Sequence, residues 1–246
     1  MAAEKETVDD SKSNDNDDNI NIIKDEKTGI LIEEFQKNVL LVRGILSIEQ
    51  QLKLYEEMIG EEKIMVDRLK KYRGDNYKPP IKDGLISMYT KQKMGGDLLE
   101  DEGIKDSIYD ILLKKGMEIV EINYKLKDIT LKDAKLGHIQ AAKYKTEEGK
   151  LKNHVDGIFH GPNAVFLFSI GCNANFYVKG PEMKKEKIFK FKSGDCLFFD
   201  ATNKAKILHG IESIDPGQTC PKQLKEKFES AGEYRIGLQM RAYYPK

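Results

Sequence analysis

The chain has 246 residues, which is enough to bury a sizeable hydrophobic core in one or two domains. Its 41 Lys and Arg residues balance its 41 Asp and Glu residues, which argues against a protein that binds polyanions through overall charge but not against a local basic patch. No apolar run approaches the roughly 20 residues that span a bilayer. The first residues contain no apolar segment typical of a secretion signal.

Cysteine usage points to a reducing compartment. The three cysteines, Cys172, Cys196 and Cys220, cannot all pair with one another, and no Cys-x-x-Cys motif occurs. Reduced thiols in an intracellular protein of the nucleus, the cytoplasm or both are the simplest account. Cys172 and Cys196 lie in apolar segments typical of strands, where we expect small buried hydrophobic side chains.

The N-terminal segment differs in composition from the rest of the chain. Residues 1–27 are acidic, rich in Asn and Asp, and contain almost no apolar side chains. Such a segment cannot offset the entropy lost on ordering, so we expect a disordered tail. Residues 28–246 then form a single domain. Residues 28–135 are expected to supply helical and loop support with a substrate lid, and residues 136–246 the core that carries the site.

Two helices are predicted in the supporting half. Residues 39–46 predict a strand, after which Ser47 and Gln50 form a capping box that starts a helix. Apolar residues recur at helical spacing until Gly60, which is expected to end this helix. Residues 101–126 predict a second amphipathic helix.

The segment between these helices is expected to be a long loop. Residues 67–96 are rich in Tyr, Lys and Gly, Pro79 and Pro80 force an extended stretch, and residues 85–89 are a candidate strand. Three tyrosines could stack on a planar substrate, or could simply pack the loop onto the body: Tyr72, Tyr77 and Tyr89.

The second half is typical of strands joined by turns. Apolar residues there run continuously or alternate with polar ones, and turns rich in Gly, Pro and charge separate the runs. This pattern predicts a β-sandwich or barrel with flanking helices, a mainly β member of the α+β class. The expected strands are residues 136–144, 164–171, 173–178, 189–191, 196–200, 205–214 and 234–244.

A candidate metal site begins at His154-Val-Asp156. In a strand, residues two apart project from the same face, so this histidine and this carboxylate point to one place. His209, in another predicted strand, is the best third ligand. Two histidines and one carboxylate that leave other positions open form the facial triad of non-haem Fe(II) oxygenases.

The last predicted strand carries two arginines on one face, Arg235 and Arg241, together with Gly237 and Gln239. If this face points inward, the arginines need carboxylates, because an unpaired buried charge is costly. A dicarboxylic ligand would supply them, since Arg binds a carboxylate through two parallel hydrogen bonds. The alternative is that both arginines face solvent.

The other two histidines of the chain are His138 and His160. His160 lies in a Gly- and Pro-containing loop after His154 and is a rival ligand, which would suit a zinc hydrolase built from His154, His160 and His209. His138 has no acidic neighbour in the sequence, so we interpret it as structural.

Residues 39–244 resemble the AlkB family of Fe(II)/2-oxoglutarate-dependent dioxygenases, and most closely a plant-like eukaryotic branch of it. The Arg-x5-Arg strand is the feature that favours this family within its superfamily. The resemblance is carried by His154-Val-Asp156, Phe166-Leu-Phe-Ser-Ile-Gly171, Ala174-Asn-Phe176, Lys192-Ser-Gly-Asp195, His209-Gly210 and Arg235-Ile-Gly-Leu-Gln-Met-Arg241.

The resemblance implies a jelly-roll core, also called a double-stranded β-helix. It implies that Fe(II) is held by His154, Asp156 and His209, with 2-oxoglutarate and O2 as cosubstrates. Arg235 would bind the distal carboxylate of 2-oxoglutarate, and Arg241 would support the cosubstrate and the metal. Tyr144 would hydrogen-bond the cosubstrate. The implied activity is oxidative demethylation of N-methylated nucleobases in DNA or RNA, with release of formaldehyde.

The sequence departs from the family pattern at Ala142 and Gly237, where an Asn is usual, and in residues 157–161, where an acidic pair is usual. Two alternatives therefore stay open: an oxygenase acting on a protein or small molecule, and a barrel that has lost its cosubstrate and serves as a nucleic-acid-binding module. Five lysines could help to track phosphates or could be a solvated face: Lys184, Lys185, Lys187, Lys190 and Lys192.

Overall fold

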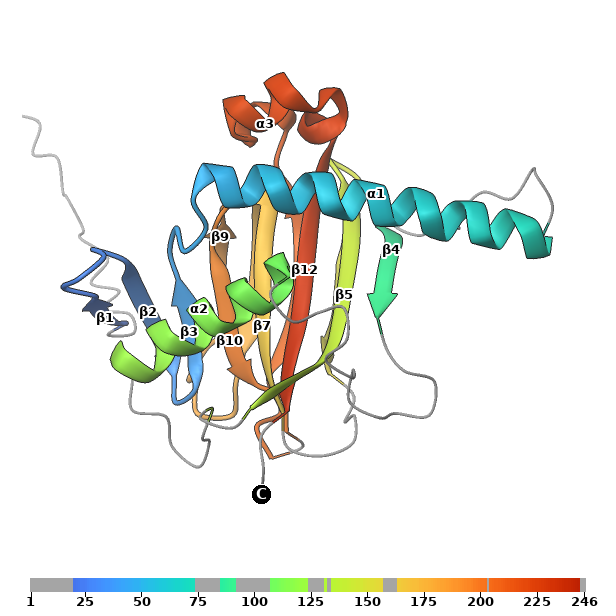
Figure 1. The fold of residues 1–246 in the computed structure, drawn as a ribbon. Helices are drawn as coiled ribbons and strands as arrows, with labels where there is room; N and C mark the ends of the chain where they lie inside the picture. Colours follow the sequence, from blue (N-terminus) through green and yellow to red (C-terminus); the bar gives the residue numbers. More distant parts are fainter. Residues whose placement is uncertain are drawn as a thin grey trace, which may run out of the picture.

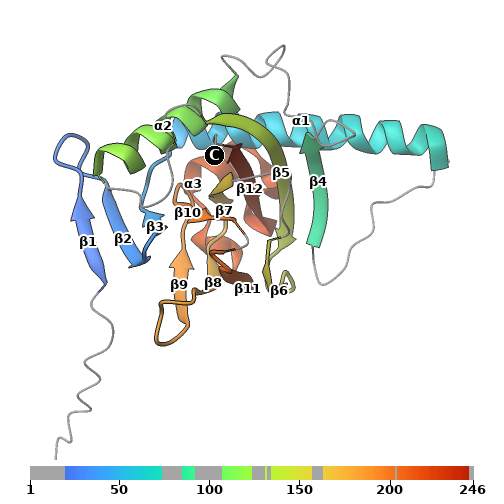
Figure 2. The same ribbon diagram turned by 90° about the horizontal axis from the view of Figure 1, so that it is seen from below.

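The computed structural model describes residues 20–73, 85–91, 107–123, 131, 134–156, 163–202 and 204–243. Helices α1 (Ile48–Arg73) and α2 (Ile108–Asn123) lie against one side of a large antiparallel sheet, and a smaller sheet lies on the opposite side (Figures 1 and 2). The short segment η1 (Gly217–Thr219), α3 (Lys222–Lys227) and η2 (Glu229–Glu233) joins the two sheets near the C-terminus.

The two sheets account for most of the regular structure described. In spatial order the larger sheet contains β1 (Asn21–Lys24), β2 (Leu31–Gln36), β3 (Val39–Val42), β10 (Cys196–Asp200), β7 (Asn163–Gly171), β12 (Tyr234–Tyr243), β5 (Lys135–Lys145) and β4 (Leu85–Lys91). The smaller sheet contains β6 (Leu151–Val155), β11 (Leu208–Ile214), β8 (Ala174–Lys179) and β9 (Lys187–Phe191).

Neighbours in both sheets are mostly distant in sequence. β7 pairs with β10 and β12, and β12 also pairs with β5, all antiparallel. This alternation of strands between two packed sheets is the jelly-roll arrangement, so the predicted fold class is confirmed. β7 lies under the helices on one side and over the smaller sheet on the other, which explains its continuous apolar sequence.

The hydrophobic core fills the space on both sides of the larger sheet. Between the sheets, Phe176, Phe189 and Phe191 form an aromatic cluster with ring centroids 5.2–5.7 Å apart. Under the helices, Phe166 packs on Phe198 with centroids 5.0 Å apart. Each of these rings is buried, and burying a large side chain contributes about 1.5–3 kcal/mol.

The predicted capping box starts α1. The backbone N–H of Ser47 donates to Gln50 Oε1 at 3.0 Å, and the N–H of Gln50 donates to Ser47 Oγ at 3.3 Å. The expectation that Gly60 ends this helix is wrong, because α1 continues to Arg73. Gly60 is exposed and a Cβ there would meet nothing within 4 Å, so nothing at this position breaks the helix. The first residues of the expected loop 67–96 are therefore helical.

An ion-pair cluster joins the outer strands to the jelly roll. The Arg43 guanidinium donates to Glu33 Oε1 at 2.6 Å and to Asp195 Oδ2 at 2.8 Å. Asp195 also accepts the N–H of Gly44 at 2.9 Å and that of Lys192 at 3.0 Å. The Asp195 carboxylate, which is nearly buried, thus ties the β9–β10 turn to the end of β3.

The predicted tail extends too far along the chain. Asn21–Lys24 forms β1, which pairs with β2, and residues 20–27 are thus ordered in this structure. The turn between these strands is built on Asp25, whose carboxylate accepts hydrogen bonds from Thr28 and from the N–H of Lys27. The sequence interpretation missed that a short polar strand can be held by its ladder and its turn. Residues 1–19 lie outside the described residues.

Several other expectations fall outside the part of the chain that is described. These are the fates of Tyr77, of His160 and of residues 157–161, and the side-chain placements of Tyr72 and Tyr89. The three cysteines are free and buried, as expected. Within the described residues, no helix combines the length and apolarity needed to cross a bilayer.

Candidate active site

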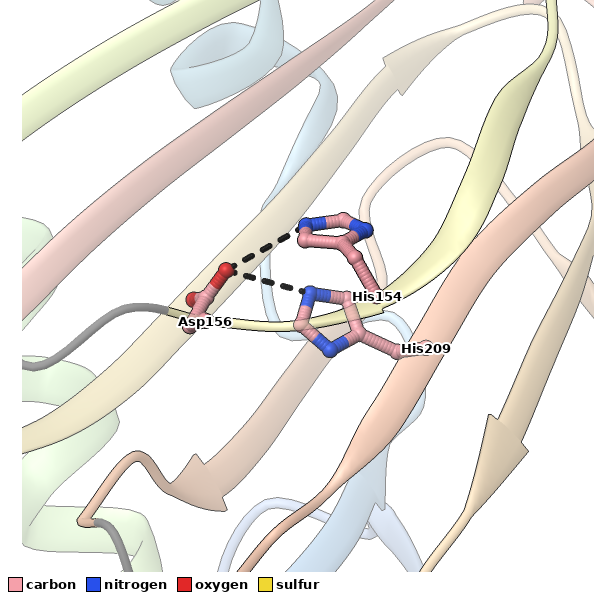
Figure 3. Close-up of side chains that lie close together, drawn as sticks. All are labelled: His154, Asp156 and His209. Atoms are coloured by element: carbon pink, nitrogen blue, oxygen red, sulfur yellow. Dashed lines mark ion pairs between the residues drawn. The ribbon is translucent and has the colours of Figure 1, made fainter.

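Two neighbouring strands of the smaller sheet build the core of the site. His154 lies on β6, Asp156 directly follows that strand, and His209 lies on β11, in register with His154. Cross-strand partners project from the same face of a sheet, so both imidazoles point the same way. One ligand atom from each of the three residues lies within 4.8 Å of the other two, a grouping that can hold a metal ion (Figure 3).

One oxygen of Asp156 faces both imidazoles. Its Oδ1 lies 3.3 Å from Nε2 of His154 and 3.6 Å from Nε2 of His209 (Figure 3). The two rings lie side by side, with centroids 4.5 Å apart. The ligand atoms that a first-row metal would use therefore already converge on one point.

Backbone carbonyls set the tautomer of both histidines. Nδ1 of His154 lies 3.0 Å from the carbonyl oxygen of Lys152, and Nδ1 of His209 lies 3.2 Å from that of Ile207. A carbonyl only accepts hydrogen bonds, so Nδ1 carries the proton in each contact. Nε2, which faces Asp156, is left with the lone pair that binds metals, and its direction is fixed by the hydrogen bond on the other nitrogen.

The other oxygen of Asp156 is held from β12. Oδ2 accepts one hydrogen bond from Gln239 Nε2 at 2.7 Å and one from Arg241 Nη2 at 2.7 Å. Arg241 is itself buried and also donates to Asn163 Oδ1 at 3.0 Å. The carboxylate thus divides its oxygens: Oδ2 is bound to the protein and Oδ1 faces the histidines.

The local fields favour the protonation states that bind metal. Burial would raise the pKa of Asp156, but the contact with the His154 ring and the guanidinium charge of Arg241 favour the ionised carboxylate, and this pKa is lowered to about 2. Burial lowers the pKa of His209 to about 4, so this ring is neutral at neutral pH. The hydrogen bond to Asp156 raises the pKa of His154. The site therefore combines an ionised carboxylate with a neutral imidazole, as ligation requires.

Arg235 is a buried cation on the same face of β12. It is fully buried, its Nε donates to Ser169 Oγ at 3.2 Å, and its guanidinium carbon lies 5.6 Å from the ring centre of Tyr144 and 5.1 Å from that of Phe191. Burial lowers the pKa of Arg235 to about 10, so it stays charged. Its buried Nη2 has no hydrogen-bond partner among the described residues. Both arginines face inward, so the solvent-facing alternative is wrong.

Small residues make room for the Arg235 guanidinium. Gly237 on β12 lies opposite Ala142 on β5, two pairs along the ladder from Arg235 and Tyr144. A Cβ at Gly237 would lie 3.0 Å from Arg235 Nη1 and 3.6 Å from Tyr144 Cε2. The two positions at which the sequence departs from the family pattern are therefore adjacent, and the glycine lets the guanidinium lie flat against the strand.

Tyr144 lies directly opposite Arg235 on β5. Its side chain is buried, and burial raises the pKa of its hydroxyl to about 12, so the phenol stays protonated and can donate a hydrogen bond. The structure thus brings Tyr144 next to Arg235, at the end of the face away from Asp156 and Arg241.

His138 is closer to this site than the sequence indicated. It is buried within β5, opposite Arg241, and the charges of Arg241 and Asp156 perturb its pKa, which burial lowers. Its pairing with Arg241 puts it at the edge of the site, and its interpretation as a structural residue stays a prediction.

Other residues of the site were not singled out by the sequence. Gln239, Ser169 and Asn163 each hydrogen-bond a charged member of the site. Of these three residues, only Gln239 could have been predicted from the sequence, because it lies between Arg235 and Arg241 on the same face of the predicted strand. Ser169 and Asn163 lie on β7, whose pairing with β12 could not be read from the sequence.

One lysine of the predicted basic run is paired with an acidic side chain. Lys190 is paired with Asp215, its Nζ lying 2.7 Å from both carboxylate oxygens. Lys184 lies before β9 and Lys187 is the first residue of that strand, in the smaller sheet. At least one of the five charges is thus already neutralised.

Comparison with known proteins supports the fold. The chain is similar to OsALKBH1, at 17% identity over 85% of this chain and 99% of that chain, with a TM-score of 0.53. It is also similar to the viral collagen prolyl hydroxylase vCPH from Paramecium Bursaria Chlorella virus-1, at 17% identity over 85% of this chain and 97% of that chain, with a TM-score of 0.48. A prolyl hydroxylase from Trichoplax adhaerens matches at 13% identity over 85% of this chain and 84% of that chain, with a TM-score of 0.45.

No protein-family model and no curated protein matches the sequence. The likeness to OsALKBH1 extends over nearly the whole of that chain, and at this low identity it shows a shared fold only. The chain therefore shares its fold with OsALKBH1, and that fold is the jelly roll that the sequence predicted.

Proposed function

We propose that the chain is an Fe(II)/2-oxoglutarate-dependent dioxygenase of AlkB type, which oxidatively demethylates N-methylated nucleobases in DNA or RNA. The observation that carries the proposal is the arrangement on one inner surface. Two imidazole Nε2 atoms and one carboxylate oxygen converge. A buried arginine, whose Nη2 meets no hydrogen-bond partner in the described part of the chain, lies on the facing sheet. The donor set is that of a facial triad, and the guanidinium suits a dicarboxylate.

Each residue then has a role. His154, Asp156 and His209 hold Fe(II), and Arg235 binds the distal carboxylate of 2-oxoglutarate with help from the Tyr144 hydroxyl. When bound, the iron and the keto acid supply the oxidation of a C–H bond by O2, with 2-oxoglutarate converted to succinate and CO2. On an N-methyl group this gives an N-hydroxymethyl product, which releases formaldehyde.

The surrounding side chains keep water from one side of the centre. His209 is enclosed by aromatic rings, with Phe199 at 4.8 Å and Phe176 at 6.2 Å between ring centroids. His154 is the exposed ligand, with 38% of its side chain accessible against 5% for His209. Substrate is therefore expected to approach from the His154 side. A base inside a duplex must first be extruded to reach such a centre.

An anaerobic titration with Fe(II) and 2-oxoglutarate, followed by admission of air, tests the chemistry. The proposal predicts succinate release that depends on both additions. The control is Asp156→Asn, which keeps one oxygen for Gln239 and Arg241 but removes the anionic ligand. Succinate release at background level from the wild-type protein would contradict the oxygenase assignment, and retained nucleic-acid binding would then favour the binding module.

A formaldehyde assay across methylated DNA and RNA oligonucleotides tests the substrate class. We expect release from at least one methylated strand and none from the unmethylated controls. If succinate forms but no strand releases formaldehyde, the nucleic-acid assignment is wrong. An oxygenase that acts on a protein or a small molecule is then favoured.

A further inference from the structure

Two side chains donate hydrogen bonds to the same oxygen of Asp156. Gln239 Nε2 and Arg241 Nη2 each lie 2.7 Å from Oδ2, whereas Oδ1 is directed at the two imidazoles (Figure 3). Both donors come from β12 in the larger sheet, while Asp156 follows β6 in the smaller one. The contact therefore also spans the two sheets at the site.

A carboxylate can give a metal either one oxygen or both. Here Oδ2 would have to give up two short hydrogen bonds, one of them from a buried guanidinium, before it could turn toward the histidines. Hydrogen bonds to a charged group are among the stronger ones in proteins. The arrangement thus commits Asp156 to offer a single oxygen, which leaves more metal positions for small ligands.

We propose that Gln239 is a positioning residue that, acting with Arg241, keeps Asp156 a one-oxygen ligand. The proposal rests on the metal site of the proposed function and adds a residue to it. Gln239 does not touch the metal position itself; it acts through Oδ2 of Asp156.

The side chain of Gln239 is not needed to build the sheet. β12 is paired on both sides, with β5 and β7, through its backbone, and Gln239 is only half-buried. Arg241 has a second partner in Asn163, so its place is held independently of Asp156. Loss of the Gln239 amide is therefore expected to loosen the carboxylate while the strand stays in place.

Titration with Co(II), a redox-stable stand-in for Fe(II), tests the proposal without any turnover. Gln239→Met keeps the length of the side chain but removes the donor, and Gln239→Asn keeps the amide but is too short to reach Oδ2. Both variants should bind Co(II) about 10- to 100-fold more weakly than the wild type. A freed Oδ2 that joins the metal takes a position otherwise filled by water, which changes the visible absorption spectrum of high-spin Co(II).

Gln140→Met is the matched control. Gln140 lies opposite Gln239 on β5, and the same substitution removes a neighbouring amide. Its Co(II) affinity and spectrum should match those of the wild type within about twofold. Thermal unfolding monitored by circular dichroism shows whether each variant is folded. If one Gln239 variant does not fold, the other still tests the proposal.

The outcomes separate the two claims. Wild-type affinity and an unchanged spectrum in a folded Gln239→Met or Gln239→Asn variant would overturn the positioning role while leaving the metal site intact. A wild-type protein that binds no Co(II) would overturn the metal site of the proposed function, and the positioning role with it.

Discussion

Arg235 carries a charge into the protein interior without an ion-pair partner among the described residues. Its neighbours there are a serine hydroxyl and two aromatic rings, Tyr144 and Phe191, which stabilise a cation only weakly. An arginine kept for structure would be expected to meet a carboxylate, as Arg43 does with Glu33 and Asp195. The contrast supports the proposal that Arg235 binds an anionic ligand.

Arg235→Met tests this contrast. An apolar side chain of similar length that replaces an unpaired buried charge should leave the free energy of unfolding unchanged within about 1 kcal/mol, or raise it. Binding of 2-oxoglutarate should weaken at least 10-fold, because hydrogen bonds to a charged group are worth about 1.5–3 kcal/mol. Urea unfolding and calorimetric titration measure the two effects.

The matched control is Arg43→Met. It breaks the pairs with Glu33 and with the buried Asp195, so it should destabilise the protein by about 1–3 kcal/mol and leave 2-oxoglutarate binding unchanged. A loss of stability in Arg235→Met as large as in Arg43→Met, with unchanged binding, would show that Arg235 is structural.

At the residue level, alternation along strands predicted which side chains share a face. His154, Asp156, Arg235 and Arg241 could be grouped in this way, because each pair lies on one strand or at its end. The contacts between pairs could not be predicted: that Arg241 and Gln239 reach Asp156 depends on how two sheets pack.

At the level of the helix, a single glycine does not determine where the helix ends. Gly60 was expected to end α1, but it lies exposed within it, where a glycine costs only about 1 kcal/mol relative to alanine. Packing of the apolar face of the helix outweighs such a cost. Gly116, in α2, is different: a Cβ there would lie 2.9 Å from Cδ1 of the buried Phe166 on β7.

The same substitution at these two glycines should therefore have opposite effects. Gly60→Ala should stabilise the protein by about 0.5–1 kcal/mol, because alanine favours the helix and nothing lies in its way. Gly116→Ala should destabilise it by about 1 kcal/mol or more, because overpacking against Phe166 exceeds the gain in helix propensity. Chemical denaturation measures both, and destabilisation by both variants would contradict the account of α1.

The strands were predicted more closely than the helices. Period-2 alternation and turn residues located β8, β9 and β11 of the smaller sheet, and the spacing of His154 and Asp156 favoured an extended segment where β6 lies. What the sequence could not supply was the order of strands, because pairs such as β3 with β10 join segments more than 150 residues apart. The family resemblance implied a jelly roll, and the order of its strands came only with the structure.

At the scale of the whole molecule, the site joins the two sheets. The proposed metal ligands lie on or directly after strands of the smaller sheet, whereas Gln239, Arg241 and the proposed keto-acid residue Arg235 lie on β12 of the larger one. Ligands that bind across this junction should stabilise the folded chain, since they bind the native state and not the unfolded one.

Thermal unfolding with Mn(II) and 2-oxoglutarate tests this coupling. At about 100 times the dissociation constant, a ligand adds about 2.7 kcal/mol, which corresponds to a rise of roughly 5–10 °C in Tm for a domain of this size. The rise should be lost in Asp156→Asn. An equal rise in wild type and Asp156→Asn would show that the metal binds elsewhere.

The most direct test of the site is a crystal of the protein grown anaerobically with Mn(II) and 2-oxoglutarate, measured for anomalous scattering. The account predicts a single strong anomalous peak about 2.0–2.3 Å from Nε2 of His154, Oδ1 of Asp156 and Nε2 of His209. The distal carboxylate of 2-oxoglutarate should pair with Arg235. A peak at other residues, or a keto acid bound away from Arg235, would contradict the account.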